Sequence, residues 1–306
     1  MIIIDAPVVN SKSNVSKGYL FAVITAIFFG INSLGIRYAF NQYPSLNPET
    51  GMVWGFIGAL ILVLPYYVTS SPARKRLIVS FKRDGWVILA ISVLTSIGGV
   101  LWIFALKHAA AGVVSLLAKV IIVYSAIFGL IFLKERFTLI ELSGFALLIP
   151  GVFLIATLES QVAPKAVAAV LVSAFIYAIQ SLLVKKYAPQ LHGMEFTYLR
   201  AICMVILFGT IFVLLGRVIF IPIEVVFILG TVSVSGMMLG RALYFEAHKY
   251  LEISKLNSAM LIEPVIVLVA AFFLLGEPLD AKKVYGGLFI LVGLWLLIHR
   301  SFRGRV

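Results

Sequence analysis

The stretch MLIEPVIVLVAAFFLLGE, Met260 to Glu277, is apolar enough to lie in lipid, although it carries a carboxylate at Glu263 and a helix-breaking proline at Pro264. About 20 apolar residues are the length that an α-helix needs to cross a bilayer. The rest of the chain has the same character: of its 306 residues, 62% are hydrophobic and 12% charged, with a mean hydropathy of +1.09. Because a water-soluble fold cannot hide so much apolar surface, the composition predicts an all-α membrane protein.

Ten apolar segments approach the spanning length, and the connections between them are short. We therefore expect ten transmembrane helices and no soluble domain. The expected helices cover residues 18–40, 51–69, 86–107, 113–133, 138–158, 165–187, 196–216, 224–247, 256–275 and 283–299.

Lysine and arginine are distributed unequally between the two sides of this predicted bundle. Sixteen fall in the N-terminal segment, the tail and alternate connections, including the stretch ARKRLIVSFKRD at 73–84, against six in the other connections. Since cytoplasmic segments are enriched in Lys and Arg, we expect a multi-pass protein of the cell (inner) membrane with both termini cytoplasmic. The net charge of +12 is therefore interpreted as a topology signal, and no nucleic-acid partner is expected.

The chain contains an internal repeat. A shift of 142 residues without gaps aligns GGVLWIFALKHAAAG (98–112) with GRALYFEAHKYLEIS (240–254) and continues through LKER and LGEP to residue 293. At the front of each half, TAIFFGINSLGIRY (25–38) resembles SAFIYAIQSLLVKK (173–186). We expect two five-helix repeats, at residues 1–160 and 161–306. An odd number of spans gives the second copy the opposite orientation, and inverted repeats are typical of transporters that alternate access to a central site.

With ten spans, a twofold five-helix repeat, LKER and LLGEP after the fourth and ninth helices, and LIEP within the ninth, the sequence resembles the drug/metabolite transporter superfamily, in its EamA-type branch. The resemblance covers essentially the whole chain. It implies a carrier or exporter of small polar metabolites, with a cavity lined mainly by the first, third, fourth, sixth, eighth and ninth helices. The sequence departs from many relatives at Ile122, where their fourth helix has the proline that Pro264 supplies in the ninth.

Lys119 and Glu263 are charges inside predicted spans, where a charge costs roughly 2.5–3.5 kcal/mol on insertion scales. We interpret Lys119 as a cationic anchor for an anionic group of the substrate; the alternative is a lysine that folds along a neighbouring helix. Glu263 is the candidate for proton coupling, or else a packing device beside Pro264. The repeat places Leu261 opposite Lys119, and two residues correspond to about 200° of rotation, so the two charges are expected to point in nearly opposite directions on their own helices.

Arg241 lies near the middle of the eighth predicted helix and shares a helical face with Tyr244. Together with Trp102 these residues suit a planar anion or an aromatic amino acid, because a guanidinium matches a carboxylate. An ion pair of Arg241 with Glu246 or Glu263 is the alternative.

The amides of Asn32 and Gln180 share one repeat position and are expected to line the cavity, with interhelical hydrogen bonding as the alternative. Arg200, close to the start of its helix, is expected to be an interfacial anchor. The predicted substrate-binding residues are Lys119, Arg241, Asn32, Gln180, Trp102, Tyr244, Ser115 and Asn257.

These features favour a secondary-active transporter, by exchange or proton coupling, of a small polar metabolite that is anionic or zwitterionic, such as an amino acid. An enzyme is not expected, because no HExxH, acid dyad at helical spacing, nucleophile with a nearby base or Gly-rich phosphate loop is present. The alternative is a lipid or polyprenyl-carrier translocase, in which the basic stretch 73–84 contacts anionic headgroups. We expect no cofactor and no metal. The expected partners are the substrate and membrane lipids, and the expected state is a monomer or homodimer.

Overall fold

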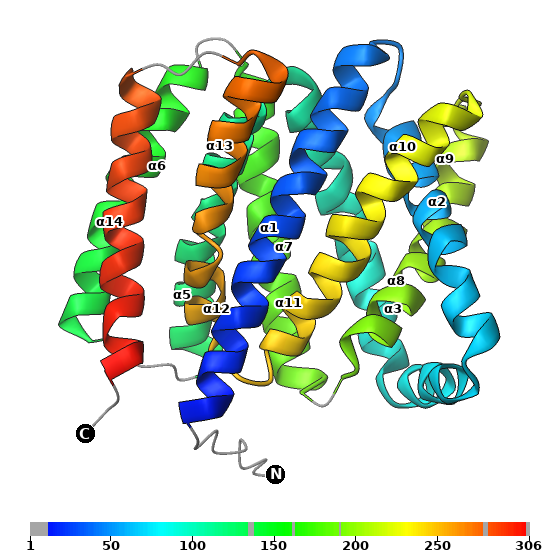
Figure 1. Cartoon of the computed structure of the whole chain (residues 1–306), viewed down its shortest axis with the longest axis horizontal. Coiled ribbons are helices and arrows are strands. Elements are labelled where there is room, and N and C mark those ends of the chain that lie inside the picture. Colours follow the sequence, from blue (N-terminus) through cyan, green and yellow to red (C-terminus); the bar gives the residue numbers. More distant parts are fainter. Residues whose placement is uncertain (1–11, 134–137, 161–162, 190, 278–280, 304–306) are drawn as a thin grey trace.

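A computed structural model of the chain describes residues 12–133, 138–160, 163–189, 191–277 and 281–303. Within these ranges every regular element is a helix, and the long helices stand side by side in one bundle (Figure 1), which confirms the predicted all-α class. The elements are α1 (Lys12–Gln42), α2 (Pro48–Thr69), α3 (Ser71–His108), α4 (Ala111–Leu117), η1 (Ala118–Val120), α5 (Ile121–Phe132), α6 (Leu139–Ser160), α7 (Pro164–Tyr187), α8 (Gly193–Met204), η2 (Val205–Gly209), α9 (Thr210–Leu214), α10 (Ile223–Ser233), η3 (Val234–Gly240), α11 (Arg241–Ala247), α12 (Ile253–Ala259), α13 (Ile262–Leu275) and α14 (Ala281–Arg303).

Eight helical segments of the described residues are long and apolar enough to cross a membrane, so the chain is a multi-pass membrane protein. They are Val15–Gln42, Pro48–Thr69, Ser71–His108, Ala111–Phe132, Pro164–Tyr187, Gly193–Leu214, Ile223–Ala247 and Lys255–Leu275. Two further helices, α6 and α14, carry shorter apolar stretches at Leu142–Gly151 and Val284–Gly293 and pack along each other at one side of the bundle (Figure 1). Eight helices thus meet both criteria where the sequence predicts ten spans.

Local sequence explains where several helices begin and end. At the start of α2 the side-chain Oδ1 of Asn47 accepts a hydrogen bond from the backbone N–H of Thr50 at 2.7 Å, and Pro48 occupies the first turn. Helix α13 ends at Leu275, and the next residue, Gly276, has a left-handed φ of +66° that favours glycine.

Helix α3 begins at Ser71, so the expectation of a loop at the basic stretch 73–84, before a helix that starts at residue 86, is wrong: the stretch is helical. These residues form the first turns of α3, which run at an angle to the other helices at the lower edge of the bundle (Figure 1). Arg76 Nε lies 2.7 Å from Glu195 Oε1 of α8. One helical face is buried against the protein, through Ala73, Ser80 and Asp84. These contacts add tertiary support to helical turns that are too basic to be counted as part of an apolar span.

The seventh and eighth expected spans contain the π-helical segments η2 and η3. Two other expected spans are interrupted at equivalent positions of the repeat. In one, the 3-10 turn η1 at Ala118–Val120 separates α4 from α5. In the other, α12 ends at Ala259 and α13 starts at Ile262. The shift of 142 residues places Ala118 on Met260, within the second interruption. Interrupted helices of this kind build binding sites near mid-membrane in transporters, since they free backbone groups and let side chains converge.

The main contacts between the two halves of the chain occur in equivalent pairs: where a helix of the first half packs on a helix of the second, their counterparts in the repeat also pack together. Helix α1 packs on η3, α11 and α13, while α7, its counterpart, packs on α3 and α5. Likewise α2 packs on α10, and α8 packs on α3. The first helix of each half therefore lies against the third and fourth helices of the other half.

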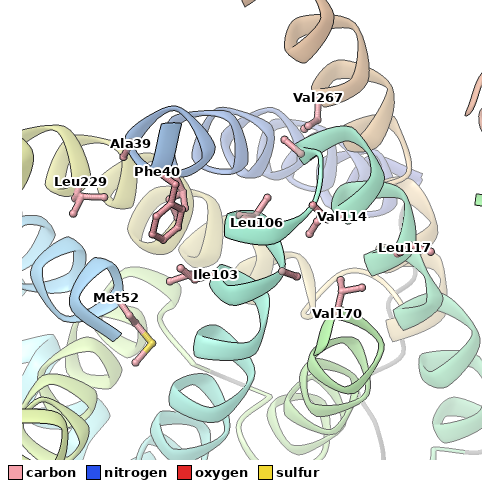
Figure 2. Packing of buried hydrophobic residues seen from close by; sticks show 14 of the residues in the cluster. Ala39, Phe40, Met52, Ile103, Leu106, Val114, Leu117, Val170, Leu229 and Val267 are labelled. Atoms are coloured by element: carbon pink, nitrogen blue, oxygen red, sulfur yellow. The ribbon is translucent and has the colours of Figure 1, made fainter. Parts of the chain in front are cut away.

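A continuous cluster of buried apolar side chains joins the halves (Figure 2). It draws on α1, α2, α3, α4, α7, α10 and α13 through Ala39, Phe40, Met52, Ile103, Leu106, Val114, Leu117, Val170, Leu229 and Val267. Helices α2 and α10 approach so closely that a Cβ added at Gly58 would lie 2.8 Å from the Cα of Gly230. Small residues permit this direct backbone contact between membrane helices.

Candidate functional site

A cavity of about 90 Å³ lies inside the bundle, between the two halves. Its wall is formed by α1, α3, η1 with α5, α7, η3 with α11, and α12 with α13. In order along the chain these are the first, third, fourth, sixth, eighth and ninth of the expected spans, as the family resemblance implies. Six of the eight predicted substrate-binding residues line this wall: Lys119, Arg241, Asn32, Trp102, Tyr244 and Asn257. Glu263 lines it as well.

Lys119 and Glu263 form a buried ion pair at the cavity. Lys119 Nζ lies 2.6 Å from Glu263 Oε2, and each residue is only 6% exposed. Ser115 Oγ donates to the other carboxylate oxygen, Oε1, at 3.3 Å. A charge-assisted hydrogen bond of this length compensates part of the cost of removing both charges from water.

The expectation that Lys119 and Glu263 point in opposite directions is wrong. That expectation assumed about 100° per residue along two continuous helices. Lys119 itself lies in the 3-10 turn η1, and Glu263 follows directly on the break between α12 and α13. Because both helices change their winding at these positions, the two side chains meet between α4 and α13, which pack together.

Three aromatic rings surround the guanidinium of Arg241. Its Cζ lies 4.7 Å from the ring centroid of Phe29, 4.9 Å from that of Tyr177 and 5.4 Å from that of Tyr244. Cations are attracted to the faces of aromatic rings, most strongly where water is excluded. Arg241 has no ion pair with a carboxylate among the described residues, so its alternative assignment to Glu246 or Glu263 is wrong: Glu246 pairs with Lys249 and Glu263 with Lys119.

A chain of hydrogen bonds crosses the cavity wall from α7 to α5. The hydroxyls of Ser181 and Tyr244 are hydrogen-bonded, and Tyr244 donates to Asn257 Oδ1 at 2.9 Å. Asn257 Nδ2 in turn donates to Ser125 Oγ at 2.8 Å. This chain holds the ring of Tyr244 in place beside Arg241 and links both halves of the molecule.

Two predicted site residues do not line the cavity. Gln180 is 1% exposed, and neither amide atom of its side chain has a hydrogen-bond partner among the described residues. Ser115 is buried behind the wall and acts on it through Glu263. Asn32 lines the wall, but its Nδ2 also donates to the carbonyl of Val232 at 2.9 Å, so both interpretations of this amide apply.

Phe29 and Ser173 line the cavity, although neither was predicted. Phe29 occupies the repeat position of Tyr177, because the shift that pairs Asn32 with Gln180 also pairs these two rings. That register is the signal by which Phe29 might have been found. Ser173 lies one turn before Tyr177 and donates to the carbonyl of Gly98 at 2.7 Å. The same register pairs Ser173 with Thr25, a hydroxyl in both halves, and this is the sequence signal that could have found it.

Arg200 is not the interfacial anchor that the sequence predicts. It is 1% exposed, and its Nη1 and Nη2 donate to Thr95 Oγ1 at 3.0 Å and to the carbonyl of Met237 at 3.1 Å. The rings of Phe56 and Phe245 each lie 5.9 Å from its Cζ. Position near a helix end is a poor guide here, since this helix begins inside a packed junction of α3, α8 and α11.

The end of the bundle toward which α13 runs is held by a cluster around Glu277. Glu277 accepts hydrogen bonds from the backbone N–H groups of Ala111 and Gly112, at 2.9 and 3.4 Å, at the start of α4. Arg37 Nε lies 3.5 Å from the same carboxylate. Arg37 Nη1 also donates to the carbonyls that end α3, those of Leu106 and Lys107. We call Arg37, Glu277 and the start of α4 the Glu277 clasp.

At the opposite end, Lys185 occupies the position that corresponds to Arg37. Its Nζ donates to the carbonyls of His248 and Leu251, where α11 ends. The carbonyls of Leu106 and His248 are 142 residues apart, which is the repeat shift. Both ends of the bundle therefore use the same device, a cation from the first helix of a half that binds the end of its third helix.

Long apolar helices around a polar, charged cavity define a membrane transport protein. The chain belongs to the EamA-like transporter family, whose model matches residues 16–157 and 164–299.

Individual proteins are similar to this chain in sequence or in structure. An uncharacterised transporter of Clostridium kluyveri is 24% identical over 286 residues, covering 90% of this chain and 91% of the relative. An uncharacterised protein of Methanocaldococcus jannaschii is 24% identical over 136 residues, covering 44% of this chain and 93% of the relative. A chain of known crystal structure, 14% identical, covers 94% of this chain and 98% of its own length with a TM-score of 0.66, which shows a shared fold.

Proposed function

We propose that this transporter moves a small polar metabolite, anionic or zwitterionic, such as an amino acid, across the cell (inner) membrane by secondary-active alternating access. The observation that carries the proposal is the cavity between the halves, where both repeat-related helices are interrupted and three charged side chains converge. Its volume of about 90 Å³ and its place inside the bundle favour a small solute over a lipid or polyprenyl carrier with a long apolar chain.

The proposal includes ten spans in two inverted five-helix repeats, at residues 1–160 and 161–306, with both termini cytoplasmic. The exchanged contacts between halves support the repeat, and so does the short relative that matches 44% of this chain. The inversion is supported by the positions of the helix ends: Lys17 near the start of α1 lies over the ring of Tyr250, beside Leu251, whose carbonyl binds Lys185 at the end of α7. Helices α1 and α7 therefore run in opposite directions.

Transport is tested by counterflow in liposomes that contain the purified chain, with pooled labelled metabolites. We expect one small polar solute to exchange, and we expect Lys119→Ala and Arg241→Gln to lower its uptake because they remove cavity charges. Full activity in both variants would reject the cavity as the transport site.

Glu263 is proposed as the proton-coupling residue. A carboxylate that takes up a proton releases Lys119, so protonation and substrate binding at Lys119 would be linked. The groups that face this carboxylate are Lys119, Ser115 and the other residues of the cavity wall. The pH dependence of uptake is expected to vanish in Glu263→Gln, and its persistence would exclude coupling through this residue.

A further inference from the structure

The charges around the cavity are not balanced by the protein. Lys119 and Glu263 neutralise each other at 2.6 Å. Arg241 has aromatic rings around it and no carboxylate partner among the described residues. Because a guanidinium remains protonated in proteins, the wall keeps one net positive charge.

Arg200 adds a second positive charge directly behind the wall. It donates to the carbonyl of Met237, a lining residue that lies one turn before Arg241 in the same span. Both of its hydrogen-bond acceptors are neutral, and its Nε has no partner in the described part of the chain. Like Arg241, it forms no ion pair with a described carboxylate.

Two buried guanidinium groups without counter-charges are costly, because a low-dielectric interior replaces little of their hydration. A solute in the cavity is close to both and can offset this cost. A zwitterion brings no net charge, and a monoanion balances one guanidinium only. We propose that the cargo of this cavity is a compact anion with two negative charges, such as a short dicarboxylate or phosphate. This assignment rests on the proposed transport function and narrows its substrate class.

The size of the cavity agrees with such a cargo. Each water-sized group needs about 10–15 Å³ of a cavity measured in this way, so about 90 Å³ holds roughly six to nine non-hydrogen atoms. Succinate has eight non-hydrogen atoms and phosphate has five, so both fit in the cavity, whereas a nucleotide does not. The fork of Arg241 suits bidentate binding of one carboxylate or phosphate group.

The test compares probes of matched shape on the purified full chain, by isothermal titration calorimetry in gluconate buffer without chloride. Succinate and its monoamide succinamate have nearly the same shape and differ by one negative charge; phosphate and the zwitterion alanine complete the set. We expect succinate to bind at least about tenfold more tightly than succinamate, which corresponds to about 1.4 kcal/mol, and alanine to bind more weakly than either.

Variants assign the preference to the two arginines. Arg241→Gln and Arg200→Met are each expected to lower the ratio of succinate to succinamate affinity toward one. Arg200→Lys keeps the charge and is expected to keep most of the ratio. Arg217→Gln is the matched control, because Arg217 is exposed and lies outside the cavity wall. If Arg200→Met does not fold, the Arg241→Gln variant and the probe series on the unaltered chain still test whether the cavity prefers a dianion.

Equal affinities for succinate and succinamate would overturn the proposal. Binding of alanine more tightly than succinate would also overturn it, and so would the absence of succinate and phosphate binding at millimolar concentrations. The same holds if added chloride occupies the site as effectively as succinate does. Counterflow separates this inference from the transport function. If only a neutral or zwitterionic solute exchanges, the dianion proposal is rejected and the transport function stands. If dianions bind but no solute exchanges in counterflow, the transport function is rejected and the dianion site stands.

Discussion

The ion pair of Lys119 and Glu263 links stability to transport at the scale of single residues. Both side chains are almost fully buried and lie 2.6 Å apart. Removing one partner of such a pair leaves a buried charge without compensation and typically costs about 3–5 kcal/mol, whereas replacing both partners by apolar or neutral groups can be neutral. The pair is therefore expected to be strongly coupled in mutational experiments.

We expect Lys119→Met and Glu263→Gln each to lower the unfolding temperature of the purified chain. The double variant is expected to recover most of the lost stability while remaining inactive in counterflow, because the proposed coupling of protonation to substrate binding needs both Lys119 and Glu263. Thermal unfolding in detergent measures both effects. A double variant that is no more stable than the less stable single variant would contradict the coupling.

The charged residues of the site were predictable, because a charge in an apolar span needs a partner or a use. That argument identified Lys119, Arg241 and Glu263 without any geometry. It did not identify the ion-pair partner of each charge, because the direction of a side chain around its helix can be calculated only when the helix is regular. The repeat argument failed for Gln180, which shares the repeat position of Asn32 but is buried outside the cavity wall, with no hydrogen-bond partner for its amide among the described residues. Aromatic residues such as Phe29 are too common in spans to stand out.

At the scale of elements, the Glu277 clasp holds together segments from different halves. Glu277 follows α13 of the second half, while its partners are the start of α4 and Arg37 of the first half. A carboxylate at a helix N-terminus satisfies free N–H groups and is favoured by the helix dipole, by about 0.3–1 kcal/mol for the dipole alone. The clasp must open whenever the halves separate at this end.

Glu277→Gln is therefore expected to loosen this end of the bundle. In a Cys203→Ala background, a cysteine at Ala174 in the cavity wall should react with a membrane-impermeant maleimide roughly two- to fivefold faster, the range for 0.3–1 kcal/mol. Glu224→Gln, an exposed carboxylate in the first turn of α10, is the control. Unchanged labelling in Glu277→Gln would show that other contacts hold the end closed.

Helices were easier to predict from the sequence than their limits and irregularities. Apolar length alone located every described span to within a few residues except the start of α3. There, the basic residues of one face lower the hydropathy of the first turns, so that apolar length does not reveal the helix, although its other face is buried. The interruption at η1 has no proline to announce it, because Ile122 stands where Pro264 stands in the other half. The ion pair of Lys119 and Glu263 lies at this level, and such a contact between distant helices cannot be predicted from local sequence.

At the scale of the whole molecule, the first helix of each half packs on the other half, so neither half completes the cavity alone. The clasp side carries fewer basic residues than the side of the chain ends, and this asymmetry is the basis of the predicted orientation. Repeat register and charge counts were both readable from the sequence. The shape of the cavity was not, because it depends on how the halves dock.

Single cysteines in the Cys203→Ala background test the orientation. Lys75 and Arg217 are both exposed and lie on opposite predicted sides. A cysteine at Lys75 should react with an impermeant reagent only in inverted membrane vesicles, and one at Arg217 only in intact cells. The reverse pattern would place both termini outside the cytoplasm.

The meeting of α2 and α10 at Gly58 and Gly230 has a mechanical consequence. In most helix pairs, side-chain ridges of one helix pack into the grooves of the other and fix the angle between them. Here the backbones of two glycines touch, and a Cβ at Gly58 would lie 2.8 Å from the Cα of Gly230. No side chain of either glycine interlocks the two halves at this point. A larger residue at either position is therefore expected to force α2 and α10 apart and to change how the halves fit together.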